Sequence, residues 1–286
     1  MPTATLNILV KWLILPKPID ITVRTPESIV KYHIKQIESL EPIHLYKAVI
    51  GLKKEILFIK EKKKKLLEVF NENIKKEFLD RNPCCLLTIE NINLPEEHNT
   101  NTIPNFLQTR IYELTYALAL LYSCPIKPLF YIYQVEGIKE IRFYSFVDGV
   151  NKKGYDEYFK ERNMKELTER YLPSLMINQR ADEKLILSLI LYKIALEMTA
   201  DKLRIIFFWT ILEVLAGNIE VNNVYKFISK YFSVDIEALK GYYDTRCKLV
   251  HSGLLKGDYD YSEANKELQK LIQEVIFSVY GNNGAK

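Results

Sequence analysis

The pattern of apolar residues changes once along this chain, near residue 150, and this change limits the folds open to it. Before it, short runs alternate apolar and polar residues, as half-buried strands do. Ile19–Arg24 is an example. After Tyr155 the strand signals end, and apolar residues recur every three or four positions, as in helices. We therefore predict an α+β protein, with a mixed α/β domain at 1–148 and an all-α helical bundle at 155–286.

The N-terminal domain is predicted to combine strands with a few helices. A turn at Pro26 opens a short helix through Ile37, and a strongly apolar helix at 106–122 packs on the sheet. A long helix at 53–79 carries a run of lysines, which is either a phosphate-binding face or, more commonly, a solvated helix face. Strands are expected at 5–15, 19–24, 45–52, 84–89, 129–135 and 138–146, the last two as a hairpin.

The C-terminal domain is predicted to be a bundle of four or five helices. The first predicted helix ends at Pro173, because proline cannot continue a hydrogen-bonded helix. Gly217 ends a later one. The predicted helices cover 155–171, 182–198, 202–216, 222–232, 235–249 and 261–280.

Composition narrows the class of protein. The 286 residues are 48% hydrophobic, enough for a sizeable core, and the net charge of +4 is compatible with nucleic-acid binding. No signal-peptide layout and no membrane-length apolar run occur, so we expect no membrane contact. The four cysteines lack metal-ligand spacing, so we expect no bound metal, and we expect no cofactor. They also show no pairing pattern, which predicts reduced thiols in a cytoplasmic protein. Neither a glycine-rich phosphate loop nor a nucleophile elbow is present.

One late stretch, Arg246–Gly253, combines residues of chemical interest. It ends a predicted helix at 235–249 with an apolar stripe, and Arg246 falls within that stripe. A guanidinium so close to a core face needs a partner. Glu213, a carboxylate in a very apolar helix, is the candidate, although it could instead face solvent. The stripe is formed by Ile236, Leu239, Tyr242, Tyr243, Leu249 and Val250.

Arg246 and His251 together suit phosphodiester chemistry. Arginine offers a permanent charge and a planar fork of donors for phosphate, and histidine both takes and gives a proton near neutrality. Successive helical residues step by about 100°, so His251 shares a face with Cys247 and Asp244. Arg246 lies further round, and it reaches His251 either because its side chain is long or because the helix ends near Val250. A surface arginine and a capping histidine would give the same short pattern by chance.

Two motifs give the C-terminal domain a resemblance to HEPN domains. Arg246-x4-His251, on the penultimate long helix of a small bundle, resembles the Arg-x4–6-His signature of that superfamily. The run 208–215 (FWTILEVL) resembles the Trp…Glu…Leu helix of the ApeA-like HEPN branch. The stretch 246–253 (RCKLVHSG) resembles that branch's Arg-Asn-x-x-Val-His-x-Gly. The resemblance covers about 175–280 and does not extend to the N-terminal domain.

The resemblance implies a metal-independent endoribonuclease that acts as a homodimer without a cofactor. Two HEPN domains would pair so that both Arg246 and both His251 side chains line one cleft. Arg246 would hold the scissile phosphate and His251 would act as general base or acid, leaving a 2′,3′-cyclic phosphate and a 5′-OH. Family members act on RNA as toxins or antiviral defence nucleases, sometimes with an antitoxin or defence-system partner. Others are inactive scaffolds for RNA or protein binding.

Four further residues are expected to support the site. Glu213 would hold Arg246, and Asp244 would orient His251 or be a plain surface aspartate. Cys247 departs from the family pattern, because that position is usually a polar residue such as Asn, and a thiol donates hydrogen bonds weakly. Lys248 would supply phosphate charge or simply be exposed. The N-terminal domain would sense a trigger or choose the target.

Overall fold

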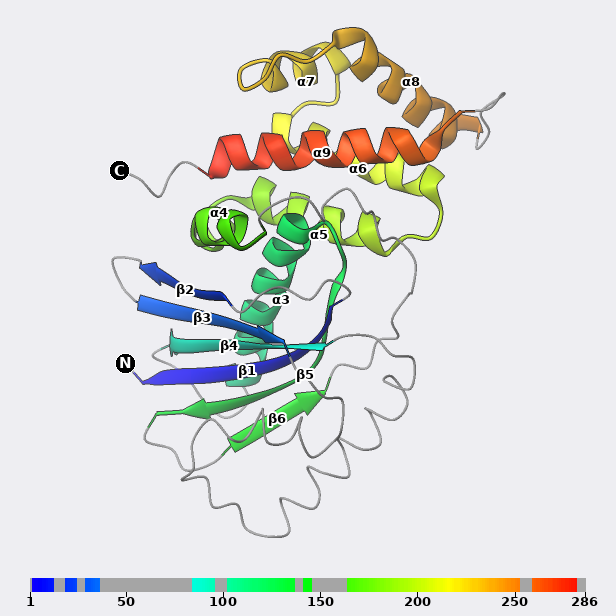
Figure 1. The fold of residues 1–286 in the computed structure, drawn as a ribbon. Coiled ribbons are helices and arrows are strands. Elements are labelled where there is room, and N and C mark those ends of the chain that lie inside the picture. Colours follow the sequence, from blue (N-terminus) through cyan, green and yellow to red (C-terminus); the bar gives the residue numbers. More distant parts are fainter. Residues whose placement is uncertain are drawn as a thin grey trace. The chain divides into compact units, whose positions relative to one another are not determined.

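The computed structural model describes residues 2–12, 19–24, 29–36, 84–95, 102–136, 141–145, 164–252 and 259–281. Within these residues lie six strands and seven helices (Figure 1). The chain divides into two compact units. The first, the sheet unit, is Met1–Thr115 with Ile126–Val150, and the second, the helical unit, is Tyr116–Pro125 with Asn151–Lys286. An antiparallel sheet fills the first and helices the second, so the predicted α+β class is confirmed.

The sheet unit contains one six-stranded sheet in the order β2-β3-β4-β1-β5-β6. All neighbouring strands are antiparallel. Strands β4 and β5 both flank β1 antiparallel and so run parallel to each other, which requires a crossover connection. Helix α3 (Thr102–Tyr122) supplies it. The strands are β1 (Thr3–Trp12), β2 (Ile19–Arg24), β3 (Ile29–Gln36), β4 (Cys84–Asn93), β5 (Ile126–Val135) and β6 (Ile141–Ser145).

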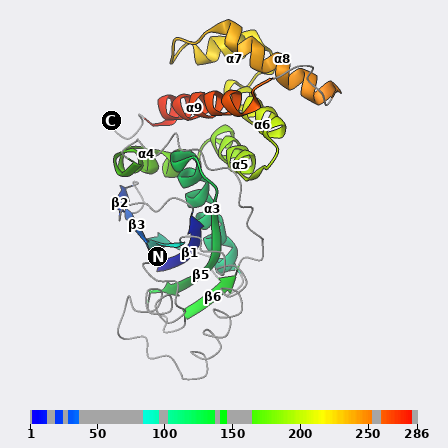
Figure 2. The ribbon, with the colours of Figure 1, turned by 45° about the vertical axis from the view of Figure 1, so that its right-hand side comes forward.

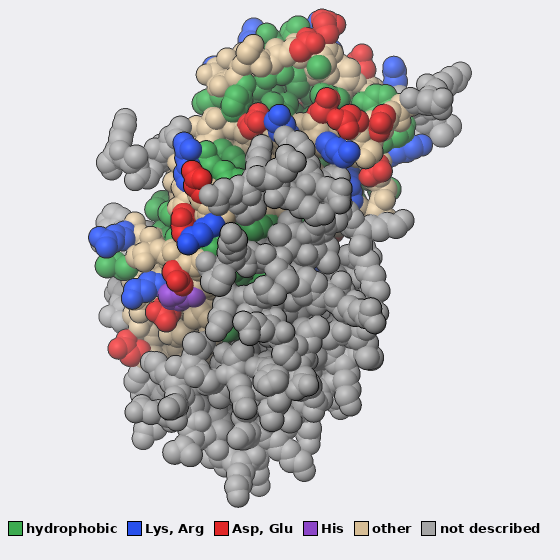
Figure 3. Space-filling model, in the orientation of Figure 1, with side chains coloured by type: hydrophobic (Ala, Val, Ile, Leu, Met, Phe, Trp, Pro, Cys, Tyr) green, Lys and Arg blue, Asp and Glu red, His purple; other side chains and the backbone are tan. Residues whose placement is uncertain are grey.

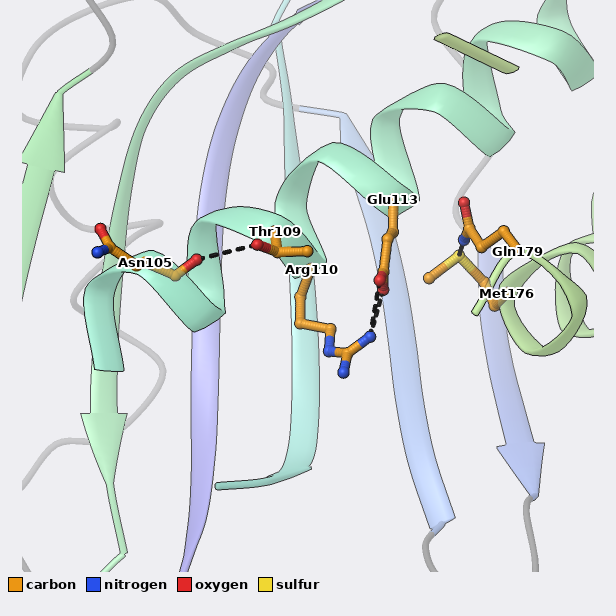
Figure 4. A network of polar contacts seen from close by, with 6 residues as sticks. All are labelled: Asn105, Thr109, Arg110, Glu113, Met176 and Gln179. Atoms are coloured by element: carbon orange, nitrogen blue, oxygen red, sulfur yellow. Dashed lines mark hydrogen bonds and ion pairs between the residues drawn. The ribbon is translucent and has the colours of Figure 1, made fainter. Parts of the chain in front are cut away.

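One face of this sheet is apolar and is covered by the first part of α3. Buried and exposed residues alternate along β2, as the sequence predicts. Figure 4 shows α3 lying across the strands, where Arg110 and Glu113 form an ion pair of 2.6 Å. The Tyr131 hydroxyl on β5 donates to the carbonyl of Pro104 on α3. The helix buries Ile103, Leu107, Ile111 and Leu114, at three- and four-residue spacing.

The predicted helix through Ile37 is wrong, because residues 29–36 form strand β3. Val30, Tyr32 and Ile34 are buried at alternating positions, and β3 pairs with β2 on one side and β4 on the other. The period of two therefore outweighs the local turn signal. The hairpin of β5 and β6 is present as predicted. The strand at 45–52 and the helix at 53–79, with its lysine run, lie outside the described residues.

The helical unit holds six helices among its described residues, one for each of the six predicted ranges, although a bundle of four or five members was predicted. Helix α9 lies between the pair α7–α8 and the pair α4–α5 in both views (Figures 1 and 2). The helices are α4 (Met164–Asn178), α5 (Glu183–Glu197), α6 (Asp201–Ala216), α7 (Val221–Ile228), α8 (Ile236–Ser252) and α9 (Tyr261–Tyr280).

The end of α3 belongs to the helical unit, whereas the sequence assigned it to the N-terminal domain. Its side chains join a buried polar network there. The Tyr192 hydroxyl on α5 lies 3.2 Å from Ser123 Oγ, and Gln273 on α9 donates to the same oxygen at 2.6 Å. Thr168 on α4 donates to the hydroxyl of Tyr122. The apolar pattern of residues 106–122 predicted the helix but not the polar contacts at its end.

Helix α4 does not end at Pro173 as predicted, but continues to Asn178. An interior proline removes one hydrogen bond and costs about 3 kcal/mol. Burial of Leu172, Leu175 and Met176 around it offsets that cost, since each buried apolar side chain contributes roughly 1.5–3 kcal/mol. Tertiary packing thus overrides a local stop signal.

Among the described residues, no single helix combines the length and the apolarity needed to cross a membrane. Helices α6 and α7 are long and apolar enough only when taken together, and a bend of 69° separates them.

Asp182 and Asp260 each cap a helix in the helical unit, and Asp182 has an additional role. Asp182 Oδ1 accepts from the backbone N–H groups of Lys184 and Leu185 at the start of α5. Its other oxygen accepts from the hydroxyl of Tyr280, at 3.0 Å. Asp260 caps α9 through the N–H groups of Ser262 and Glu263 alone.

We predict that Asp182→Ala costs more stability than Asp260→Ala. Loss of a cap costs about 1 kcal/mol, and loss of the Tyr280 hydrogen bond about 1 kcal/mol more. Urea denaturation of both variants measures the difference. Tyr280→Phe should cost about 1 kcal/mol in the wild type and almost nothing in Asp182→Ala. Equal losses in the two aspartate variants would contradict the prediction.

We also predict a loss of stability at alkaline pH that depends on Tyr280. Burial, followed by the bond to Asp182, raises the pKa of Tyr280 above its ordinary value of 10.0. A raised folded-state pKa means that the stabilisation is full below pH 10 and declines as the pH rises further. Tyr280→Phe should therefore flatten the fall in unfolding free energy between about pH 10 and 12. An unchanged slope would refute this role of Tyr280.

Candidate functional site

Helix α8 carries five of the six predicted site residues and runs further than expected. It continues to Ser252, two residues beyond Val250, so His251 lies in its last turn. Leu239 and Leu249 are buried, as predicted for the apolar stripe. Val250 is 50% exposed and does not belong to that stripe. It lies about 100° round the helix from Leu249, which turns it away from the core.

Arg246 contacts Glu213, the partner that the sequence suggested. Arg246 Nη2 lies 3.4 Å from Glu213 Oε2, so the ion pair links α8 to α6. The Glu213 side chain is 8% exposed and that of Arg246 is 25% exposed. The alternative of a solvent-facing Glu213 is therefore wrong. A carboxylate this buried needs a counter-charge, and the guanidinium provides it.

The other oxygen of Glu213 is bound within α6. Trp209 Nε1 donates to Glu213 Oε1 at 2.9 Å, from one helical turn earlier. The Trp209 side chain is fully buried, so it cannot swing away from the carboxylate. Glu213 is thus fixed by an indole on one side and holds a guanidinium on the other. This arrangement orients Arg246, whose side chain stays partly exposed although its Nε is buried without a hydrogen-bond partner in the described residues.

Tyr243 and Cys247 form a second contact beside this pair. The Tyr243 ring packs on Trp209, with centroids 5.6 Å apart at an angle of 58°. A hydrogen bond with Cys247 raises the pKa of the Tyr243 phenol, and the nearby Arg246 opposes the shift. The half-buried Cys247 is therefore engaged by Tyr243, one turn back, although it lies close in angle to His251.

His251, Asp244 and Lys248 are all exposed on α8. Within the described residues, His251 makes no hydrogen bond or ion pair. Asp244 lies two turns before it, about 10 Å along the helix axis, and no hydrogen bond joins the two. Its predicted role in orienting His251 stays a prediction. The same holds for a phosphate-binding role of Lys248.

A single chain brings Arg246 to Glu213 but does not bring it to His251. The two residues are five positions apart on α8, which turns their side chains about 140° from each other. The sequence did not assign a role to Trp209 as the ligand of Glu213. Their four-residue spacing on one helix was the signal for it.

No group of His, Cys, Asp and Glu side chains in the described ranges is placed to hold a metal ion. Comparisons of the chain with protein-family models, curated proteins and solved structures find no match.

We predict that Glu213→Ala destabilises the chain far more than Glu213→Gln. The glutamine keeps an acceptor for Trp209 and loses only the charge, at a cost of about 1–2 kcal/mol. Alanine leaves both the indole and the guanidinium unpaired, at a cost of about 3 kcal/mol or more. Urea denaturation measures both. The exposed control Asp244→Asn should change stability by less than about 0.5 kcal/mol, and equal effects of the two Glu213 variants would contradict the assignment.

Proposed function

We propose that this chain is a metal-independent endoribonuclease of the HEPN type, cutting RNA to leave a 2′,3′-cyclic phosphate and a 5′-OH. The observation that carries the proposal is the ion pair between Arg246 and the buried Glu213. Arg246 lies on α8, the helix that also carries the exposed His251. A partly exposed arginine fixed by a buried carboxylate is suited to binding an anion in one orientation. This ion pair supports the family resemblance of the Arg246-x4-His251 motif.

Arg246 would bind the scissile phosphate through the exposed part of its guanidinium. The planar fork matches two phosphate oxygens and stabilises the extra charge that develops on them during attack. Because Glu213 and Trp209 fix the guanidinium from behind, little conformational freedom is lost on binding.

His251 would move the protons. As base, the imidazole takes the proton of the ribose 2′-OH while that oxygen attacks phosphorus. The bond from phosphorus to the 5′-oxygen breaks, and a second imidazole, protonated, gives its proton to the leaving oxygen. Histidine suits both roles because its unperturbed pKa lies near neutrality. The exposure of His251 leaves it open to RNA.

A homodimer would complete the site. The angle of about 140° between Arg246 and His251 on α8 favours a site in which a second copy supplies the complementary groups. Two arginines and two histidines would then line one cleft, one imidazole as base and the other as acid. The biological setting we propose is antiviral defence or toxin activity in the cytoplasm. An antitoxin or defence-system partner would restrain the nuclease, and the sheet unit would sense a trigger or choose the RNA.

Cys247 favours one alternative function, an inactive HEPN dimer that binds RNA or a partner protein. In the branch that the motif resembles, this position commonly carries Asn. Here a thiol stands there, and it is engaged by Tyr243 instead of presenting an amide beside His251. This alternative predicts RNA binding without turnover.

We predict cleavage of labelled RNA by the purified protein in the presence of EDTA. His251→Ala should reduce the rate by about 100-fold or more, because general acid–base catalysis contributes on that scale. Arg246→Lys should also slow cleavage, since it keeps the charge but loses the fork. Gel analysis and end-group mapping measure the rate and the cyclic phosphate.

Lys240→Ala is the matched control, because Lys240 lies on α8 and, within the part of the chain that the structure describes, pairs only with the exposed Glu237. It should cleave at the wild-type rate. Binding without cleavage by the wild type would favour the inactive scaffold. Cleavage that persists unchanged in His251→Ala would rule out the nuclease mechanism.

A further inference from the structure

An open groove of about 480 Å³ lies in the helical unit, between α8, α9 and the segment at 232–235 that precedes α8. Its apolar lining includes Phe232, Val234, Leu239 and Leu271. Only Leu239 is fully buried, so the other apolar side chains remain partly open to solvent. A volume of this size is typical of a ligand-binding pocket. Figure 3 shows acidic, basic and apolar side chains side by side over the part of the molecule formed by α8 and α9.

Carboxylates dominate the charge around this groove. Asp235, Glu267 and Glu274 line it together with one cation, Lys270, which leaves an excess of two negative charges. Glu267 accepts the hydroxyl of Tyr242 and retains further lone pairs. Glu274 makes no hydrogen bond or ion pair within the described residues. The local charge is opposite in sign to the net charge of the chain, which is +4.

The groove differs from the proposed nuclease site in its charge. On α8, Tyr242 in the groove faces the opposite way from His251, nine residues further on, whereas Arg246 lies one turn beyond Tyr242 and only about 40° round from it. Negative charge also repels RNA phosphates. The charge of the groove therefore favours a positively charged ligand over RNA.

We propose that this groove binds a basic amphipathic segment of a partner protein. Its apolar side chains enter between α8 and α9, as in helix-in-groove recognition. Its lysine or arginine side chains pair with Glu267 and Glu274, which are two helical turns apart, about 10 Å along α9. The negative charge of the groove favours a basic segment over an acidic one. The apolar lining favours a ligand with apolar side chains, which a simple polyamine lacks.

A synthetic peptide set tests the proposal with the full-length chain. The probe is a fluorescent helical peptide of about 15 residues, with leucines along one face and two lysines seven positions apart. A second peptide carries glutamates in place of the lysines, and a third carries alanines in place of the leucines. Fluorescence anisotropy at about 0.15 M salt limits non-specific charge attraction.

We expect saturable binding of the basic peptide and weak or absent binding of the other two. The double variant Glu267→Gln/Glu274→Gln should weaken it about tenfold, through the loss of two half-exposed ion pairs. The control Glu169→Gln/Glu183→Gln has the same net charge, changes exposed residues outside the groove, and should bind normally. Melting curves establish that all variants fold.

Three outcomes would overturn the proposal: no saturable binding of the basic peptide, equal binding of the glutamate peptide, or an equal loss in both double variants. Labelled RNA provides an independent arm. It should bind the Glu267→Gln/Glu274→Gln variant at least as well as the wild type. A loss of RNA binding in that variant would assign the groove to RNA and refute a protein partner.

Discussion

The buried carboxylate of Glu213 is the interaction on which the arrangement of the proposed site depends. It accepts from Trp209 within α6 and pairs with Arg246 on α8, so one acidic group fixes two helices against each other. Burying such a charge is costly unless both of its oxygens are bound. Here both are, by an indole that cannot move and by a guanidinium that reaches the surface. The contact between α6 and α8 at this point and the orientation of Arg246 therefore depend on the same group.

Helix α8 separates two kinds of chemistry on its surface. Arg246 and His251 lie on its second half, and an acidic, partly apolar groove lies beside its first half. His251 faces away from the groove, whereas Arg246 lies one turn beyond Tyr242 on nearly the same side of α8. The two regions are therefore separated along the helix and by the charge that each prefers. An anion is favoured at the arginine and a cation at the groove.

Much of the fold follows from residue periodicity. The alternation in β2 and the spacing in α5, α6 and α9 correspond to the observed elements, because burial on one face imposes that pattern. The predicted elements that were wrong lie where tertiary packing outweighs a local sequence signal. Pro173 lies inside α4 because its neighbours are buried, and β3 exists because two strands flank it. The polar network around Ser123 was not predictable, since its partners come from distant helices.

By itself, the sequence determined the α+β class, the helical character of the C-terminal half and the residues of chemical interest on α8. It also proposed Arg246 as the partner of Glu213, since a charge buried in an apolar stripe is costly unless an opposite charge pairs with it. Only the tertiary structure decided that this pair forms, that Trp209 completes it, and that His251 stays exposed on a helix that continues past it. The physical reason is distance along the chain. Periodicity reports which face of a helix is buried, but the contact between residues 213 and 246 depends on how two separate helices pack.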